Sequence, residues 1–156
     1  MIDMLVRLYD LPDSAALYAD IAAMGVTLRR ARAFEQHTVA EFVRTNFSEK
    51  WVSEVHIALT RQPAACFIAT RDQRILGFAC HDTTRRGFFG PTGVAQDERG
   101  IGLGKALLFK TLEALRELGY AYAIIGGVGP KEFYGKTCGA IEIPGSDPGI
   151  YTDLLP

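Results

Sequence analysis

The sequence has few cysteines and no long run of apolar residues. Its three cysteines, Cys66, Cys80 and Cys138, are an odd number without C-x-x-C spacing, so neither a disulfide framework nor a metal site is expected. No apolar stretch approaches the roughly 18–20 residues that cross a bilayer. The segment Met1 to Met4 lacks the basic and apolar regions of a signal peptide. We therefore expect a cytoplasmic protein that binds no metal and no membrane.

The sequence also lacks an excess of either charge. Seventeen Lys and Arg against eighteen Asp and Glu give a net charge of -1, which excludes a strong electrostatic attraction to nucleic acid. With 48% hydrophobic and 22% charged residues, the composition is that of a folded protein. At 156 residues, without repeats or a linker, the chain is expected to form one domain. We divide it into an N-terminal strand-helix extension (1–25), a core (26–143) and a Gly/Pro-rich tail (144–156).

The hydrophobic pattern predicts a mixed α/β order of elements. Short apolar runs bounded by Gly, Pro or polar residues predict strands at 4–9, 26–32, 65–70, 75–80, 88–94, 120–125 and 140–143. Apolar residues at helical spacing predict helices that begin after Ser14, before Val39, after Ser48 and near Leu103, with a short helix around 133–136. The runs at 65–70 and 75–80 are joined by four polar residues and predict a hairpin.

The most informative stretch joins the strand that ends at Val94 to the helix that begins near Leu103. Gly100, Gly102 and Gly104 lie at this junction. Glycine lets backbone N–H groups approach a ligand, and a helix N-terminus adds unpaired N–H donors with a partial positive charge. The stretch therefore predicts a phosphate or pyrophosphate site, with a simple turn as the alternative.

The spacing of these glycines excludes two common nucleotide sites. A P-loop needs four residues between its first glycine and Gly-Lys, followed by Ser or Thr. Here three residues separate Gly100 from Gly104, and Ala106 follows Lys105. A dinucleotide fingerprint would need glycine in place of Lys105, within a first strand-helix unit. Neither site is predicted.

Two motifs resemble those of the GNAT (GCN5-related) family of acetyl-CoA-dependent N-acetyltransferases. Arg99 to Gly104 resembles its (Arg/Gln)-x-x-Gly-x-(Gly/Ala) signature, and Phe133 to Ala140 resembles its aromatic-Tyr-x-Lys-x-Gly-aromatic element. The resemblance covers Val26 to Ile143 in the same order of elements. It implies an α/β fold with a mixed, mostly antiparallel central sheet, a splayed parallel strand pair and helices on both faces. It also implies direct attack of a primary amine on the acetyl-CoA thioester.

The resemblance assigns acetyl-CoA, with CoA as product, to a set of residues on both motifs. They are Val94, Ala95, Arg99, Gly100, Ile101, Gly102, Leu103, Gly104, Lys105, Gly127, Phe133, Tyr134 and Lys136. The N–H of Val94 is expected to contact the acetyl carbonyl. The second motif departs from the family: Gly127 and Pro130 stand in place of an Asn and a small residue, and no aromatic follows Gly139.

The residues at two strand ends support a gap in the sheet independently of the resemblance. Pro91 cannot donate to a ladder, and Gly90 and Gly93 weaken the same strand. Gly126 and Gly127 do likewise where the next parallel strand ends. Two such strands should splay and leave main-chain groups for an extended ligand arm. The alternative is a bulge or an edge strand without a ligand.

The chemistry requires a general acid and a general base. By resemblance, Tyr134 is the acid. The strand at 88–94 has no carboxylate, so Asp82, His81 and Glu132 remain as candidate bases, each with a solvated surface role as its alternative.

The acceptor is expected to be an amine on a small molecule or a protein. By resemblance, its specificity comes from Phe34 to Leu59 and from Gly145 to Tyr151, and neither segment has a run of acid. A non-catalytic acyl-CoA-binding sensor or regulatory module is the alternative function. A homodimer, common among such proteins, remains open.

Overall fold

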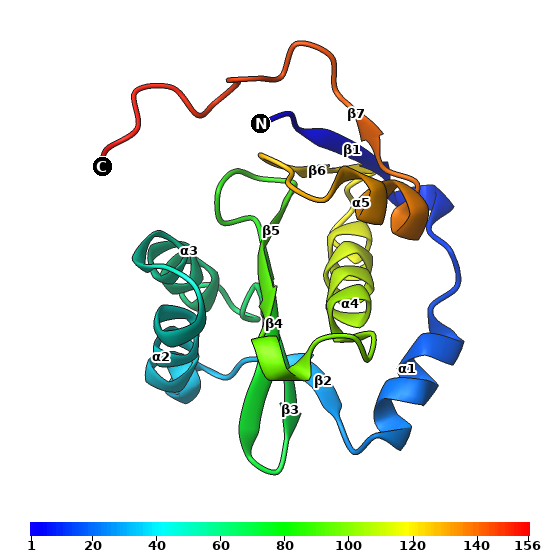
Figure 1. The fold of residues 1–156 in the computed structure, drawn as a ribbon, viewed down its shortest axis with the longest axis vertical. Coiled ribbons are helices and arrows are strands. Elements are labelled where there is room, and N and C mark those ends of the chain that lie inside the picture. The colour runs from blue at the N-terminus through cyan, green and yellow to red at the C-terminus, as the bar shows by residue number, and fades with distance from the viewer.

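The short apolar strands and amphipathic helices assemble into one seven-stranded sheet with helices on both faces (Figure 1). A computed structural model describes residues 1–156. The strands are β1 (Met4–Arg7), β2 (Thr27–Arg30), β3 (Cys66–Arg71), β4 (Arg74–His81), β5 (Phe88–Val94), β6 (Tyr122–Ile125) and β7 (Ile141–Glu142). The helices are α1 (Ala15–Ala23), α2 (Gln36–Asn46), α3 (Glu49–Leu59), α4 (Leu103–Glu117) and α5 (Lys131–Cys138), with short 3-10 turns at Leu8–Asp10, Ala33–Glu35 and Gln96–Glu98.

The strand order is β2-β3-β4-β5-β6-β1-β7, and every neighbouring pair is antiparallel except β5 and β6. This arrangement confirms the expected mixed, mostly antiparallel sheet. The hairpin expected from the two apolar runs is formed by β3 and β4. Its turn consists of Asp72 and Gln73, both with positive φ (51° and 61°). Positive φ at both positions lets a two-residue turn match the twist of the two strands.

The N-terminal strand lies inside the sheet. Met4 of β1 is in register with Ile125 of β6 on one side and with Glu142 of β7 on the other. Helix α1 follows and is tied to α4 through Glu113, which accepts hydrogen bonds from the Ser14 and Tyr18 hydroxyls. The segment 1–25 therefore contributes a strand and a helix to the same layers as the core.

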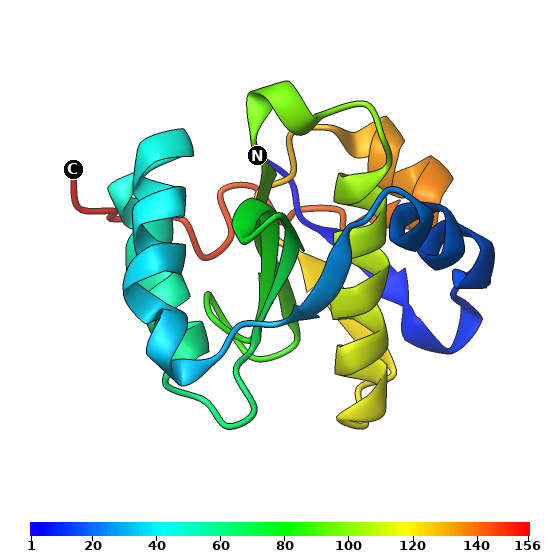
Figure 2. The ribbon, with the colours of Figure 1, turned by 90° about the horizontal axis from the view of Figure 1, so that it is seen from below.

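The sheet separates two hydrophobic clusters. Helices α2 and α3 cover one face, and α1, α4 and α5 cover the other (Figures 1 and 2). The predicted apolar side of α4 is buried, with Leu107, Leu112 and Leu115 all 0% exposed. No helix is both long and apolar enough to cross a lipid bilayer. No three His, Cys, Asp or Glu side chains gather as a metal-binding group.

Strands β5 and β6 pair for only two residues before they separate. The register joins Phe88 to Ile124 and Phe89 to Ile125, and no ladder continues beyond these pairs. Gly90 and Pro91 follow on one strand, and Gly126 follows on the other. Gly126 has no room for a side chain, because a Cβ there would overlap the Tyr151 hydroxyl. The splayed parallel pair expected from the sequence is confirmed.

Candidate active site

Two cavities meet at the gap between β5 and β6. One, here called the loop cavity, has a volume of about 610 Å³ and is lined by the end of β5, the glycine loop and the first turn of α4. The other, called the tail cavity, has a volume of about 480 Å³ and lies between α3, the gap and the C-terminal tail. Four residues line both cavities: Phe89, Thr92, Pro130 and Tyr134. A ligand in one cavity can therefore reach a ligand in the other across these side chains.

The glycine loop presents backbone N–H groups to the loop cavity. Gly100 and Gly102 have φ of 88° and 92°, a conformation that residues with a Cβ avoid. The first helical hydrogen bond of α4 joins the Ala106 N–H to the Gly102 carbonyl (3.0 Å), so the preceding N–H groups have no acceptor within the helix. A Cβ on Gly100 would meet no atom within 4 Å. The loop thus forms an open cradle of donors that suits a phosphate group.

The charges around the cradle favour an anion. The Glu98 carboxylate pairs with Arg71 of β3 at 2.9 Å. This ion pair joins the loop to the sheet and neutralises the charge of Glu98. Arg99 is exposed, and its Nε donates to the Val94 carbonyl at 3.1 Å. Lys105 is also exposed and lines the cavity. Arg99 and Lys105 remain as positive charges without a carboxylate partner.

The end of β5 directs a backbone donor toward the gap. The Ala95 N–H donates to the Leu76 carbonyl at 2.9 Å, on the β4 side. Because N–H groups alternate in direction along a strand, the Val94 N–H points to the opposite side, where β6 has separated. The contact expected between the Val94 N–H and an acetyl carbonyl requires this direction.

Tyr134 lies at the junction of the two cavities. Tyr134 belongs to α5 and is 8% exposed. The rings of Phe89 and Phe133 pack against its ring, with centroids 6.2 and 5.1 Å from the Tyr134 centroid. Burial, with a smaller effect from Cys138, raises the pKa of Tyr134 to about 12. Its hydroxyl makes no hydrogen bond to another residue. The phenol is therefore protonated at neutral pH and free to donate.

The tail cavity combines aromatic side chains with a single carboxylate. Trp51 and Glu54 of α3, Phe88 of β5 and Tyr151 of the tail line it. The Thr84 hydroxyl, from the loop between β4 and β5, donates to Glu54. Burial raises the pKa of Tyr151, and the nearby charges of Asp3 and Glu54 raise it further. Tyr151 and Glu54 therefore line the same cavity from different segments of the chain.

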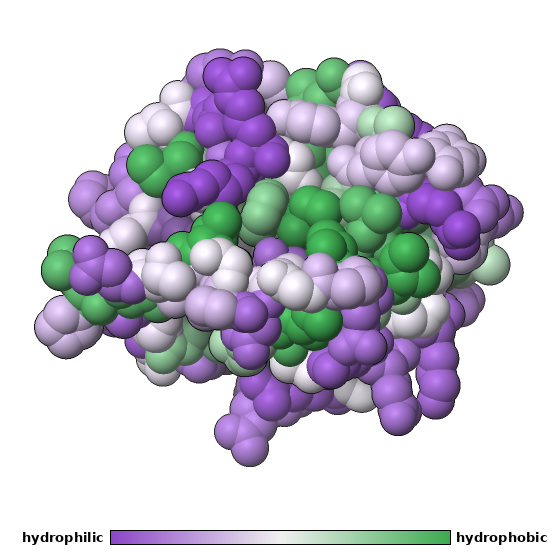
Figure 3. All heavy atoms as spheres, turned by 90° about the horizontal axis from the view of Figure 1, so that it is seen from above, coloured by the Kyte–Doolittle hydropathy of each residue, from purple (hydrophilic) through white to green (hydrophobic).

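The C-terminal tail runs from β7 toward α3 (Figure 1), and its Tyr151 lines the tail cavity. The Lys50 ammonium donates to the Leu155 carbonyl at 3.0 Å, and Asp147 pairs with the Met1 ammonium at 2.6 Å. Figure 3 shows the face on the side of β7 and the tail, with hydrophobic residues gathered near its middle among hydrophilic ones. The tail brings Tyr151 to the cavity wall.

Residues 30–140 match the family model described as the acetyltransferase (GNAT) family. The chain belongs to the GNAT family. Family membership supports acetyl transfer as its general chemistry, in agreement with the resemblance of the two motifs.

Solved structures with the same fold include other GNAT proteins. A GCN5-related glucosamine N-acetyltransferase region of a fungal multi-domain GH3 β-N-acetylglucosaminidase has a TM-score of 0.76 at 17% identity, covering 91% of this chain and 19% of that chain. A GCN5-related N-acetyltransferase from Sphaerobacter thermophilus has a TM-score of 0.68 at 19% identity, covering 91% of this chain and 48% of that chain. A GNAT acetyltransferase from Brucella melitensis, in complex with acetyl-CoA, has a TM-score of 0.52 at 22% identity, covering 70% of this chain and 81% of that one.

This GNAT domain spans less than half the length of the first two of these chains. No curated protein sequence matches it.

Most residues that the sequence assigns to acetyl-CoA line the loop cavity. They are Val94, Arg99, Gly100, Gly102, Leu103, Gly104, Lys105, Phe133 and Tyr134. Gly127 lines the tail cavity instead, and its N–H donates to the Asp3 carboxylate at 2.8 Å. Ala95, Ile101 and Lys136 line neither cavity: Ala95 is buried, Ile101 packs against the core, and Lys136 is exposed.

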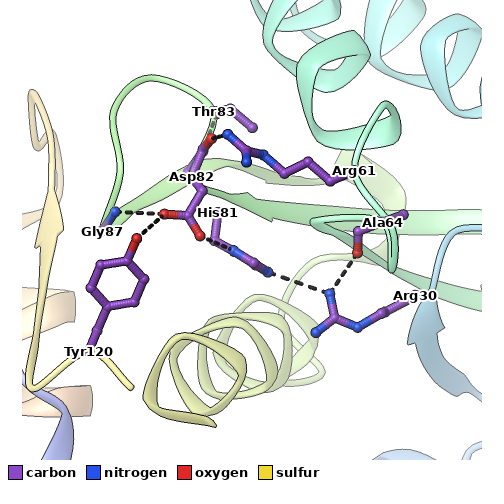
Figure 4. A network of polar contacts seen from close by, with 9 residues as sticks. Arg30, Arg61, Ala64, His81, Asp82, Thr83, Gly87 and Tyr120 are labelled. Atoms are coloured by element: carbon purple, nitrogen blue, oxygen red, sulfur yellow. Dashed lines mark hydrogen bonds and ion pairs between the residues drawn. The ribbon is translucent and has the colours of Figure 1, made fainter. Parts of the chain in front are cut away.

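Two of the three candidate bases of this GNAT domain form a buried network (Figure 4). His81 and Asp82 are 3% and 6% exposed, and the His81 Nδ1 lies 2.7 Å from the Asp82 carboxylate. The other carboxylate oxygen accepts from the Gly87 N–H at 2.7 Å and the Tyr120 hydroxyl at 3.0 Å. The Asp82 carbonyl accepts from Arg61 at 2.7 Å. Neither His81 nor Asp82 lines either cavity.

The third candidate base, Glu132, lies on the surface of α5. Its side chain is 89% exposed, and it lies 3.6 Å from the Lys136 ammonium. It lines neither cavity. The structure therefore brings Tyr134 into the gap but does not bring any of the three candidate bases there.

Sequence reasoning named the segments that line the tail cavity but not the individual residues. Trp51 and Glu54 fall within Phe34 to Leu59, and Tyr151 ends the other expected segment. The spacing of Trp51 and Glu54, three residues apart on one helix face, is the only local signal that pairs them. Nothing in the local sequence connects Thr84 to them.

Proposed function

We propose that this protein is an acetyl-CoA-dependent N-acetyltransferase that acts on a primary amine. The observation that carries the proposal is the position of Tyr134, a protonated phenol at the junction of a donor-lined cavity and a carboxylate-bearing one. Acetyl-CoA, when bound, supplies an acetyl group activated as a thioester.

The residues of the loop cavity fit acetyl-CoA. The free N–H groups at Leu103, Gly104 and Lys105 would hold the pyrophosphate, with the cradle at Gly100 open to receive it. Arg99 would release the Val94 carbonyl and turn to the phosphates, because its guanidinium suits an anion better than a carbonyl.

The gap would hold the pantetheine arm. Beyond Phe89 and Ile125 the two strands offer main-chain groups to an extended chain with two amides. The Val94 N–H would then face the acetyl carbonyl and would stabilise negative charge on its oxygen. Tyr134 gives its phenolic proton to the departing sulfur, a role typically worth 10²–10⁴-fold in rate.

The experiment is thermal melting with acetyl-CoA, CoA, ATP and NAD. At about 100 times the dissociation constant, a ligand adds about 2.7 kcal/mol to the free energy of unfolding, which raises Tm by roughly 5–10 °C in a domain of this size. We expect this increase with acetyl-CoA and CoA only. No increase with either contradicts the proposal, an increase with ATP alone favours a nucleotide-binding module, and CoA binding without turnover of any amine favours the sensor.

Two glycine variants localise the binding. Gly100→Ala and Gly119→Ala both place a Cβ at positive φ (88° and 102°) in open space, one in the loop cavity and one at the far end of α4. Their backbone strain is thus comparable. We expect only Gly100→Ala to lose the increase in Tm with CoA.

A further inference from the structure

We propose that Glu54 binds the acceptor ammonium and takes its proton, and that the tail cavity selects amines with one positive charge and no carboxylate or phosphate beside it. This inference rests on the proposed acetyl transfer and assigns the acceptor site within it. It concerns the wall of the tail cavity that α3 provides.

The charge of the tail cavity is the first argument. Glu54 is the only acidic or basic side chain that lines it, and no Lys, Arg or His does. The Thr84 hydroxyl donates to one carboxylate oxygen, and the other oxygen accepts no hydrogen bond from the protein. Glu54 is half-buried, so an ammonium beside it is less screened than at an exposed pair.

The charged groups nearest to this cavity do not neutralise Glu54. Arg85 is exposed and donates to the Thr84 carbonyl at 3.0 Å. The Met1 ammonium, at the mouth, pairs with Asp147. Asp3, behind Gly127, is acidic and accepts from the Gly127 N–H. Both positive groups at the rim already have oxygen partners, and no Lys, Arg or His side chain lines the cavity to bind an anion. The unpaired oxygen of Glu54 therefore favours a cation there.

Aromatic rings complete the recognition of a cation. Trp51, Phe88 and Tyr151 line the same cavity as Glu54. Ring faces attract an ammonium, and their flat surfaces also bury an apolar or planar body. Since Glu54 and Trp51 are three residues apart on α3, one rigid helix positions both the carboxylate and the indole.

The positions of Glu54 and Tyr134 place base and acid on opposite sides of the gap. Glu54 lies on α3, which covers one face of the sheet, and Tyr134 lies on α5, on the other face (Figure 1). Both residues line the tail cavity. An amine held at Glu54 can therefore attack from one side while the sulfur departs toward Tyr134.

The protons balance in this arrangement. Glu54 takes one proton from the ammonium, and the freed nitrogen lone pair forms the C–N bond with the acetyl carbon. The C–S bond breaks with its electron pair on sulfur, to which Tyr134 gives its proton. The second proton lost by the nitrogen returns to Tyr134 through water, and Glu54 releases its own proton to solvent.

The other candidate bases lie outside the tail cavity, and neither His81 nor Asp82 lines it. Both oxygens of the Asp82 carboxylate already accept hydrogen bonds, from His81, Gly87 and Tyr120. Glu132 is on the surface, outside both cavities.

The test uses two pairs of acceptors that differ only in an added anionic group: tryptamine with tryptophan, and glucosamine with glucosamine 6-phosphate. We expect the anionic member of each pair to have a kcat/KM at least 10-fold lower, because no cation in the cavity meets its carboxylate or phosphate. Equal kcat/KM within both pairs would overturn the selectivity.

Variants test the role of the carboxylate. Glu54→Gln preserves size but removes the charge; Glu49→Gln makes the same change on an exposed part of α3 and serves as the matched control. We expect Glu54→Gln to lower kcat/KM for tryptamine at least 100-fold and to abolish calorimetric binding of tryptamine to the CoA complex. The increase in Tm with acetyl-CoA should persist in both variants.

The outcomes separate this inference from the proposed function. Absence of any increase in Tm with acetyl-CoA in the wild type contradicts the proposed function itself. A normal increase with none of the four amines bound or acetylated contradicts the acceptor assignment. Glu54→Gln with kcat/KM within threefold of wild type, or an equal loss in Asp82→Asn without unfolding, contradicts the role of Glu54.

Discussion

Substitution of Asp82 tests whether the buried network at the end of β4 stabilises the fold or transfers protons. Its carboxylate accepts from His81, Gly87 and Tyr120 at 2.7, 2.7 and 3.0 Å. A hydrogen bond to a charged group contributes about 1.5–3 kcal/mol, and three that share one carboxylate are not additive. We expect Asp82→Ala to lower the free energy of unfolding by about 3 kcal/mol, which corresponds to a decrease in Tm of roughly 6–12 °C.

Acid pH gives an independent check on this network. Burial raises the pKa of Asp82, but hydrogen bonds from Gly87, His81 and Tyr120 outweigh it, and the pKa lies below its ordinary value. A lowered carboxyl pKa stabilises the fold above about pH 3.9, and this stabilisation is lost as the pH falls through the folded value. Burial also lowers the pKa of His81, which costs stability as the pH falls below about 6.5. The stability difference between wild type and Asp82→Asn should therefore shrink below about pH 4.

The assay is urea unfolding followed by Trp51 fluorescence at pH 7 and at about pH 3, below the ordinary carboxyl pKa, together with acetylation kinetics. Asp20→Ala, on the exposed side of α1, is the control and should change stability by less than about 0.5 kcal/mol. A loss below about 1 kcal/mol in Asp82→Ala would refute the assignment to stability. The assignment would also be refuted if Asp82→Asn kept normal stability and a normal KM but lost most of its kcat. That result would identify Asp82 as a proton acceptor.

Three further substitutions have defined outcomes. Tyr134→Phe should keep the increase in Tm with acetyl-CoA but lower kcat by roughly 100-fold or more in steady-state kinetics, because the proton donor to sulfur is lost. Gly126→Val should displace Tyr151, whose hydroxyl a Cβ would overlap, and raise the KM for the amine in steady-state kinetics. Leu112→Ala, at a position 0% exposed in α4, should lower the free energy of unfolding by about 3 kcal/mol in urea titration.

Features encoded by a few neighbouring residues were predictable from the sequence. Ser48 was expected to cap a helix, and its hydroxyl accepts from the Trp51 N–H at 3.3 Å at the start of α3. Gly25, with φ of 76°, follows the end of α1, a place where glycine commonly ends a helix. The separation of β5 from β6 followed from Pro91 and the flanking glycines, because these residues cannot continue a ladder or weaken it.

Features that depend on distant partners were not predictable. His81 and Asp82 end an apolar strand, where a solvated position is common, and their burial comes from Arg61 and Tyr120, which other elements supply. Glu54 lies in an ordinary amphipathic pattern. Its place in a cavity depends on how α3 packs against the gap, which no local spacing encodes.

The position of β1 has a consequence for how the chain folds. Met4 pairs with Ile125 and Glu142, so the part of the sheet beyond the gap closes only when nearly the whole chain is present. By contrast, β3, β4 and β5 pair with strands next to them in the sequence. Closure of long loops is costly in entropy and slows folding. We therefore expect the hairpins to form early and the β6 wall of the gap to form last, so that a nascent or truncated chain has a folded half-sheet but no place for a thioester.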